Sequence, residues 1–241
     1  MEARSRIVVE SIAGRLRVAE LRSEPPLTLR RTGPAEISIV GSAAAPLGGD
    51  RLALDVVVGA GASLVVRSVA ASLAYPGVSG DESTLDVSVT VGPGAALDWA
   101  PQPTVAVTGC RHHARSSIAL ADESSRLRWC DVMVRGRSGE RSGAMRQRLD
   151  VDRAGRPLLR NEVAIGGNAG IDDASFGDHR VIAGAVRVGE QAGAAAAGTD
   201  GLVAWACHPL APDAGAWTVL GRNLAGVRAA LDRAEAATRK G

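Results

Sequence analysis

Two short segments of the sequence carry side chains that commonly bind metal ions. Cys110 is followed closely by His112 and His113, and Cys207 directly precedes His208. Thiolate and imidazole groups suit Zn, Ni or Cu. One hypothesis is therefore a metal site that uses Cys110, His112 and His113, with Cys207 and His208 as a second pair. The alternative is that neighbouring histidines on a strand face opposite sides of a sheet, and that the cysteines are small buried hydrophobic residues.

Two carboxylates lie in glycine-rich turns. Asp50 follows Gly48 and Gly49, and Glu140 lies within residues 135–143. Each carboxylate could bind a cation, but side-chain oxygens in such turns also accept hydrogen bonds from backbone N–H groups. The residues by themselves leave both interpretations open.

The common catalytic motifs are absent from the sequence. It contains no Gly-x-Ser-x-Gly, GxxxxGK[ST] or HExxH pattern. Lys240 is the only lysine, which excludes catalysis by a lysine within the fold. The turn at residues 58–63 lacks the third glycine of a dinucleotide-binding loop, and a strand rather than a helix is predicted after it.

The composition excludes further classes of function. The 241 residues carry a formal net charge of +2, and aromatic residues make up 2% of them. A strongly basic nucleic-acid-binding surface and an aromatic stacking platform are therefore excluded. No apolar run approaches the roughly 18 residues that a membrane span needs. The first residues lack a signal-peptide pattern and the three cysteines lack CxxC spacing, so we expect reduced thiols in a cytoplasmic protein.

An internal repeat dominates the first half of the chain. Residues 52–64 have the sequence LALDVVVGAGASL, and residues 85–97 have the sequence LDVSVTVGPGAAL. Each copy predicts a strand of period two, a Gly-x-Gly-Ala turn and a second strand. The period places four apolar side chains on one core-facing side: Leu52, Leu54, Val56 and Val58.

A third copy follows with a polar turn, over residues 118–129. Its residues Ile118, Leu120, Leu127 and Trp129 correspond to Val89, Val91, Leu97 and Trp99 of the second copy. Stacked units of this kind build layered sheets whose faces are covered by neighbouring units. Residues 149–159 predict a further hairpin, with Gly155 in its turn.

The later part of the chain is less regular. Residues 166–178 predict a loop rich in Gly and Asp, and a strand is predicted over residues 179–188. Residues 189–201 contain an alanine run between glycines, which is compatible with a short helix or a mobile loop.

The end of the chain predicts a helix over residues 221–239, because Leu224, Val227 and Leu231 recur at helical spacing. We therefore predict a mainly β fold, with layered antiparallel or mixed sheets built from strand–turn–strand repeats, a C-terminal α-helix and few other helices. One domain over residues 1–241 is the simplest organisation, since no linker divides the chain.

Short motifs run in a fixed order through residues 47–181. They are LGGDRL (47–52), VGAGA (58–62), LDWAPQPT (97–104), LRW (127–129), GRSGE (136–140), RAGRPLL (153–159) and GDHRV (177–181). The series resembles the urease accessory protein UreD family, called UreH in some systems. GGDRL and WxPQPT are specific in combination, and the resemblance covers most of the chain.

The resemblance implies a non-catalytic, cytosolic and largely β scaffold. Such a scaffold binds the urease apoprotein and the F-type accessory protein, which recruits the G-type GTPase. The assembly delivers nickel to the urease active site in a GTP-dependent step. The scaffold itself has no tightly bound cofactor, and nickel crosses it through an internal passage lined by polar and acidic groups. By motif match, Asp50 is the first candidate for such a lining residue and Glu140 the second.

Nickel in transit needs weak, successive contacts to oxygen or imidazole, because a closed site would trap the ion. The family pattern does not demand His112 or His113, so nickel binding there would be peculiar to this protein. The sequence also departs from a family segment similar to TQAATKVY, which here is SVAASLAY over residues 68–75. Val69 and Leu73 replace its Gln and Lys.

The surfaces for partners are less specific in the sequence. The helix around Leu224, Val227 and Leu231 and the Arg/Gly-rich residues 135–148 are candidate contacts, but they could equally be core packing and a solvated loop. An alternative function is a β-rich, metal-dependent, cupin-like enzyme that uses the Cys/His cluster at residues 110–113. A β-repeat interaction module outside the urease system is a further alternative.

Overall fold

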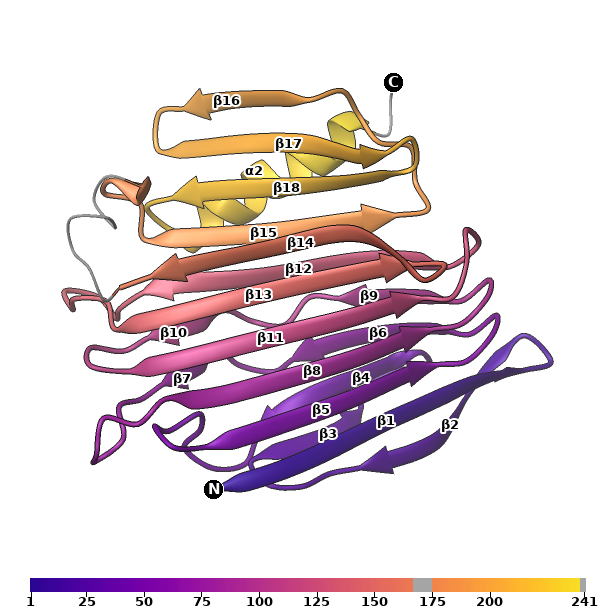
Figure 1. Ribbon diagram of the computed structural model, residues 1–241, viewed down its shortest axis with the longest axis horizontal. Helices are drawn as coiled ribbons and strands as arrows, with labels where there is room; N and C mark the ends of the chain where they lie inside the picture. The colour runs from indigo at the N-terminus through magenta and orange to yellow at the C-terminus, as the bar shows by residue number, and fades with distance from the viewer. Residues whose placement is uncertain (167–174, 239–241) are drawn as a thin grey trace.

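The computed structural model contains two β-sheets that lie face to face, with a C-terminal helix against one end of the second sheet (Figure 1). The structure describes residues 1–166 and 175–238, and side chains up to residue 234. The predicted mainly β fold with layered, mixed sheets and a C-terminal helix is confirmed. Most of the loop predicted over residues 166–178 lies outside the described residues.

The first sheet has seven strands, and its inner strands run parallel to one another. In order across the sheet they are β14 (Arg156–Ile165), β13 (Ala144–Arg153), β11 (Arg111–Leu120), β8 (Ser83–Val91), β5 (Arg51–Val58), β1 (Glu2–Ile12) and β2 (Arg15–Arg22).

The second sheet has eleven strands. Nine follow one another across it: β16 (Ala196–Asp200), β17 (Val203–Ala211), β18 (Ala214–Gly221), β15 (Val181–Val188), β12 (Arg126–Arg135), β9 (Ala96–Trp99), β6 (Ser63–Ser68), β4 (Glu36–Gly41) and β3 (Leu27–Arg31). The short strands β10 (Thr104–Ala106) and β7 (Ser72–Ala74) branch from β12.

The chain coils through both sheets. After β5 it crosses to β6, passes through β7 and returns as β8, which lies parallel to β5. Leu52 pairs with Leu85 in the first sheet, and Leu64 pairs with Leu97 in the second. Both pairings keep the spacing of the sequence repeat, so one copy of the repeat is one turn of a β-helix.

The third copy of the repeat forms the next turn of this β-helix. Each of its four apolar residues pairs with the counterpart expected from the sequence: Ile118 with Val89, Leu120 with Val91, Leu127 with Leu97 and Trp129 with Trp99. Replacement of the glycine turn by a polar one leaves the pairing intact, because the strands on both sides set the register.

The main core lies between the two sheets. Leu52, Leu54, Val56 and Val58 are at most 3% exposed, as the period-two pattern predicts. With so few aromatic residues, the cluster is filled mainly by Val, Leu, Ile and Ala from both sheets. Branched aliphatic side chains suit this interior, because they pack closely on a pleated surface.

Beyond β13, which still lies parallel to β11, the parallel coiling ends. The hairpin predicted around Gly155 is formed by β13 and β14, and the predicted strand at residues 179–188 is β15. The prediction of a helix or loop over residues 189–201 is wrong for its second half, which is strand β16. Its small residues gave no strand signal, and pairing with β17 decides the conformation: Gly198 lies opposite Trp205, where a Cβ would fall 3.0 Å from the indole ring.

The C-terminal helix α2 (Leu224–Thr238) is confirmed. It begins after Asn223, whose side-chain oxygen accepts a hydrogen bond from the backbone N–H of Gly226 at 2.8 Å, as an N-cap residue does. Its apolar side packs on β15, β17 and β18 in a second core cluster. None of the described helical segments is long and apolar enough to cross a membrane.

Successive coils touch through glycine at the end where β5 and β8 begin. A Cβ at Gly48 would lie 2.3 Å from the backbone nitrogen of Gly77 and 2.7 Å from the carbonyl oxygen of Asp81. No side chain fits in this space. The close backbone contact between turns therefore requires glycine at the first position of the GGD motif. The contact also holds the loop that carries Asp50.

We predict that Gly48→Ala lowers the free energy of unfolding by about 1–3 kcal/mol, the usual cost of overpacking. Urea unfolding followed by circular dichroism measures the change. Gly41→Ala is the control, because a Cβ there would meet no atom within 4 Å. Equal unfolding midpoints for the two variants would show that the turns do not depend on this contact.

Candidate functional site

Buried polar side chains form a row across the first sheet, at the end where β5, β8 and β11 begin. His112 pairs with Ser83, and the pairing of Arg51 with Thr84 puts Asp50 beside Ser83. Asp50, Ser83 and His112 are 4%, 0% and 2% exposed. Neighbouring strands lie about 4.8 Å apart, so Asp50 and His112 are separated by roughly 10 Å across the sheet.

The imidazole of His112 is held by Ser83, whose Oγ lies 2.9 Å from His112 Nδ1. Burial, together with the charge of His113, lowers the pKa of His112 to about 4. The ring is therefore neutral at neutral pH. A neutral imidazole keeps a nitrogen lone pair that can bind a metal ion.

Asp50 has a structural role in the same row. Its Oδ2 accepts a hydrogen bond from the backbone N–H of Leu47 at 2.9 Å, and its Oδ1 lies 2.7 Å from the amino nitrogen of Met1. The carboxylate thus caps its own turn, which is one of the two interpretations of the sequence. The Asp50 carboxylate also lies buried beside Ser83. The same side chain therefore caps the turn and contributes a polar group to the interior.

His112 also lines a cleft of about 320 Å³ with largely apolar walls. Leu52 and Leu85 contribute from the first sheet, and Val69 and Leu73 line the cleft from the segment around β7. By the resemblance described above, Val69 and Leu73 stand where the similar family segment has Gln and Lys. The departures therefore alter the wall of the cleft that His112 lines.

The other residues of the Cys/His cluster do not join the polar row. His113 lies on the opposite face of the sheet from His112, and among the described residues its buried Nε2 has no hydrogen-bond partner. Burial raises the pKa of the Cys110 thiol to about 11, helped by the charge of Glu140. A thiol must lose its proton to bind a metal. No three His, Cys, Asp or Glu in the described part of the chain could hold a metal ion together.

Glu140 is bound within its own turn. It accepts hydrogen bonds from the backbone N–H of Arg137 at 3.0 Å and from its Nε at 2.9 Å. The Arg137 contacts lower the pKa of Glu140 to about 2, so the carboxylate is ionised. Glu140 precedes β13, three strands across from Asp50, which corresponds to roughly 14 Å at the same end of the sheets.

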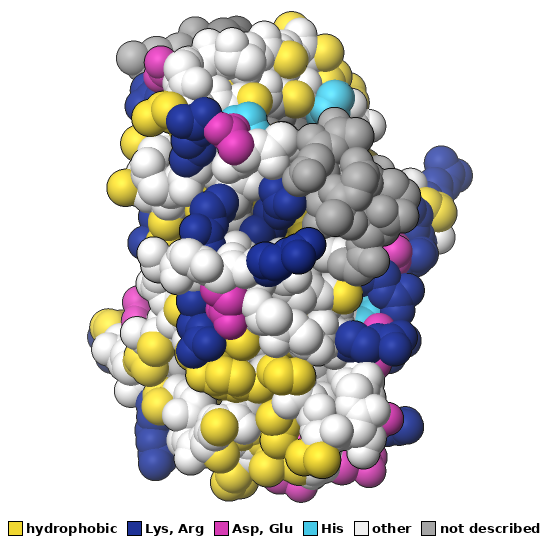
Figure 2. Space-filling model, turned by 90° about the vertical axis from the view of Figure 1, so that its left-hand side faces the viewer, with side chains coloured by type: hydrophobic (Ala, Val, Ile, Leu, Met, Phe, Trp, Pro, Cys, Tyr) yellow, Lys and Arg dark blue, Asp and Glu magenta, His cyan; other side chains and the backbone are white. Residues whose placement is uncertain are grey.

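This end of the molecule has two chemically different parts (Figure 2). Basic side chains gather across its middle, and hydrophobic side chains lie together below them. Leu47 and Val78, from the loops before β5 and β8, are 42% and 108% exposed. An exposed apolar cluster beside charged groups is typical of a protein–protein contact.

The apolar residues of α2 face the protein's own second sheet. Val227 and Leu231 are 0% and 4% exposed, and the partly buried Leu224 packs on the same cluster. These three side chains are therefore occupied in the core. The outer face of α2 carries the exposed Arg228 and Asp232.

The sequence analysis did not single out Asp131, which joins two stacked tryptophans. The rings of Trp99 and Trp129 lie 4.6 Å apart at an angle of 3°. Both indole N–H groups donate to the Asp131 carboxylate, at 3.2 Å from Trp99 and 2.5 Å from Trp129. The Trp-x-Asp spacing on β12 was the available signal, because period two places both side chains on one face.

Asp131 also lines a cavity of about 240 Å³ between the two sheets. Gln147, Asn161 and His208 line it from β13, β14 and β17. Burial raises the pKa of the Asp131 carboxyl to about 6, although the indole N–H groups of Trp99 and Trp129 act to lower it. The cavity thus combines oxygen and imidazole groups with a carboxyl that titrates close to neutral pH.

These features define a β-helix protein with mixed sheets and polar groups in its interior. The chain belongs to the urease accessory protein UreD family, since the family described as UreD urease accessory protein matches residues 1–240.

Several relatives carry the same name. The chain is 43% identical to urease accessory protein UreD of Parafrankia sp. (strain EAN1pec), over 65% of this chain and 55% of that protein. It is 39% identical to urease accessory protein UreD 1 of Saccharopolyspora erythraea, over 90% and 82%. It is also 39% identical to urease accessory protein UreD of Frankia casuarinae, over 69% and 62%. The matched part of the chain thus spans less than two thirds of the Parafrankia and Frankia relatives.

We predict that Asp131→Asn changes the pH dependence of stability. The raised pKa means that the folded state binds a proton more tightly than the unfolded state, so this carboxyl's contribution to stability falls as pH rises from about 4 to about 6. Asparagine removes that dependence. The free energy of unfolding of the variant minus that of the natural chain should therefore be higher at about pH 7 than at about pH 4, which means that the variant gains relative stability as pH rises.

Urea unfolding at both pH values measures this difference, with Asp81→Asn at an exposed site as the control. A difference between variant and natural chain that is the same at both pH values would contradict the assignment.

Proposed function

We propose that this chain is a non-catalytic, cytoplasmic scaffold for urease maturation. It binds the urease apoprotein and the F-type accessory protein, and the F-type protein brings in the G-type GTPase. The assembly inserts nickel into urease in a GTP-dependent step. Nickel is cargo for this protein, which needs no tightly bound cofactor of its own.

Membership of the UreD family is the observation that carries the proposal, because the relatives are named as urease accessory proteins. The surface supports a scaffold role. One end presents exposed apolar side chains such as Leu47 and Val78 beside a basic region. Such a surface suits a lasting contact with another protein. The Arg/Gly-rich residues 135–148 include the connection between β12 and β13, residues 136–143, at the same end.

For the passage of nickel, the buried row Asp50–Ser83–His112 is the part of the interior that we favour. Its oxygen and imidazole groups each offer one or two contacts, which suits brief binding of a borderline metal ion. Glu140, ionised at the same end, would attract the cation before entry. Cys110, with its protonated thiol, and His113, on the outer face, are weaker candidates for contact with nickel.

The alternative of a cupin-like enzyme has no observation in its favour. His112 and His113 point to opposite faces of β11 and cannot share one ion in this arrangement. A general β-repeat interaction module is compatible with the fold, but family membership favours the urease system.

We expect co-expression with the F-type accessory protein of the same organism to give a stoichiometric complex in size-exclusion chromatography. Val78→Glu should weaken that complex, because it places a charge in the exposed apolar region. Ile12→Glu is the matched control, since Ile12 is a half-exposed apolar residue on β1, away from this region. A well-behaved monomer that ignores the partner and holds one tight metal ion would overturn the scaffold proposal.

We expect Asp50→Asn and His112→Ala each to lower the nickel content of urease matured in the presence of the full accessory set. His113→Ala is the control, because it removes an imidazole from the opposite face of the same strand. Nickel per urease active site is measured by elemental analysis, and complex formation is checked in parallel to exclude unfolding. Unchanged nickel content with an intact complex would contradict the passage, while the scaffold role would stand.

A further inference from the structure

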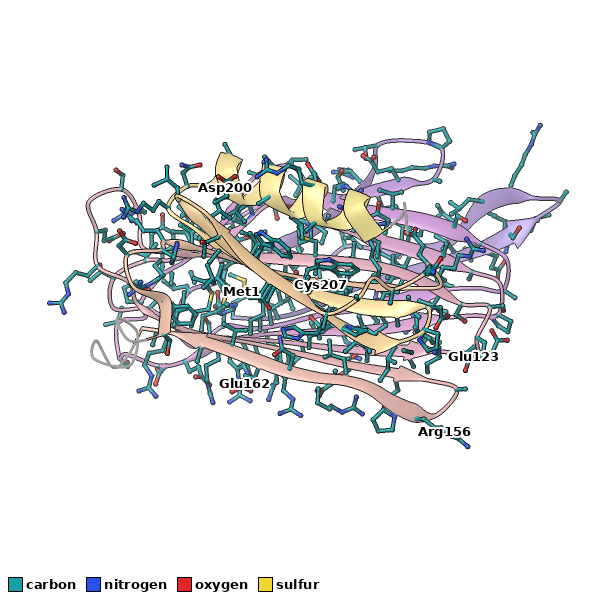
Figure 3. The ribbon with its side chains drawn as sticks, turned by 90° about the horizontal axis from the view of Figure 1, so that it is seen from above. Met1, Glu123, Arg156, Glu162, Asp200 and Cys207 are labelled. Carbon is teal, nitrogen blue, oxygen red and sulfur yellow. The ribbon has the colours of Figure 1, made fainter. Side chains whose placement is uncertain are left out.

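A second cavity lies between the second sheet and α2, away from the polar row. It has a volume of about 600 Å³. Trp205 and Cys207 on β17 and Trp217 on β18 line one side, and Ala230 and Arg233 on α2 line the other. Figure 3 shows α2 along this face of the sheet, with Cys207 labelled on the strand that it covers. The volume and the aromatic lining are typical of a site for a small organic molecule.

Trp217 lines both this cavity and the cavity of Asp131, and its indole N–H is an unpaired donor in the part of the chain that the structure describes. Trp217 is 3% exposed, and within the described residues its Nε1 has no hydrogen-bond partner. A buried donor without an acceptor is destabilising, and native proteins leave few such groups. An acceptor atom on a bound molecule would remove that destabilisation.

Among the described residues, Arg233 is the one charged residue in the lining of the cavity. The one anion in contact with its guanidinium, again within the described part of the chain, is Asp200, at 3.3 Å. Both side chains are largely exposed, at 62% and 77%, so their ion pair is weak and open to exchange. An arginine beside an apolar cavity suits an acidic group on a ligand, because the guanidinium binds carboxylates and sulfonates by paired hydrogen bonds.

We propose that this cavity binds a small organic anion with a flat, apolar body. The body lies between the tryptophan rings and the alanines of α2, the acidic group lies against Arg233, and an acceptor atom meets the N–H of Trp217. The site is separate from the polar row, and it does not rest on the proposed role in urease maturation.

The probe for this site is 8-anilino-1-naphthalenesulfonate, which has a flat apolar body and one negative group. We expect one molecule to bind per chain, with energy transfer from tryptophan to the bound dye. Ala196→Phe, which fills the cavity from β16, should weaken binding on the order of tenfold. Ala197→Phe is the matched control, because the next residue on the strand faces the other way and does not line the cavity.

Two further variants test the polar contacts and remain informative if Ala196→Phe does not fold. Arg233→Gln should weaken the sulfonate dye but not N-phenyl-1-naphthylamine, which has the same rings without the charge. Arg228→Gln on the same helix, outside the lining, is its control. Trp217→Phe keeps an aromatic ring but removes the donor, and should weaken the dye roughly fivefold.

Absence of saturable binding, or equal losses for Ala196→Phe and Ala197→Phe, would overturn the proposal. If the dyes do not bind but Ala196→Phe prevents binding of the F-type protein, the cavity is a protein-docking groove and the small-molecule proposal is wrong. Circular dichroism of each variant distinguishes a filled cavity from an unfolded chain.

Discussion

In-register pairing between successive coils is the constraint on which the rest of this structure depends. Parallel backbone hydrogen bonds join β5 to β8 and β8 to β11. They stack each apolar position on its counterpart in the coil before. Because side chains alternate along a strand, a slip by one residue would turn the core-facing set outward. The same register puts Asp50, Ser83 and His112 side by side, so the polar row and the core have a common cause.

Most polar groups inside such a core find a partner. His112 has Ser83, Asp50 has the backbone of its own turn, and Asp131 accepts from two stacked indoles. Burial nevertheless disfavours the charged forms, which lowers the pKa of His112 and raises that of Asp131. The interior therefore offers a neutral imidazole and a carboxyl that titrates near neutrality. Groups of this kind can exchange a cation or a proton without holding it permanently.

The regions suited to contact and to transit lie at one end of the molecule. The turns before β5, β8 and β13 are brought together there because the parallel strands all begin at that edge. Asp50 is buried in one of these turns, Glu140 lies ionised in another, and Val78 is exposed in the third. The C-terminal part of the chain has a different architecture, in which antiparallel strands carry a helix on one face. This arrangement forms the tryptophan-lined cavity.

The sequence by itself determined the period-two strands, the repeat, the pairing of Trp129 with Trp99 and the C-terminal helix, because these follow from local patterns of apolar residues and from self-similarity. It also placed the chain in its family through motifs such as GGDRL. Only the tertiary structure decided that residues 196–200 form a strand, that His112 and His113 separate to two faces, and that Asp131 holds two indoles. Those outcomes depend on residues distant in the chain. The alanine-rich β16 takes its conformation from pairing with β17. The buried carboxylate of Asp131 acquires its role because the strand register brings Trp99 against it.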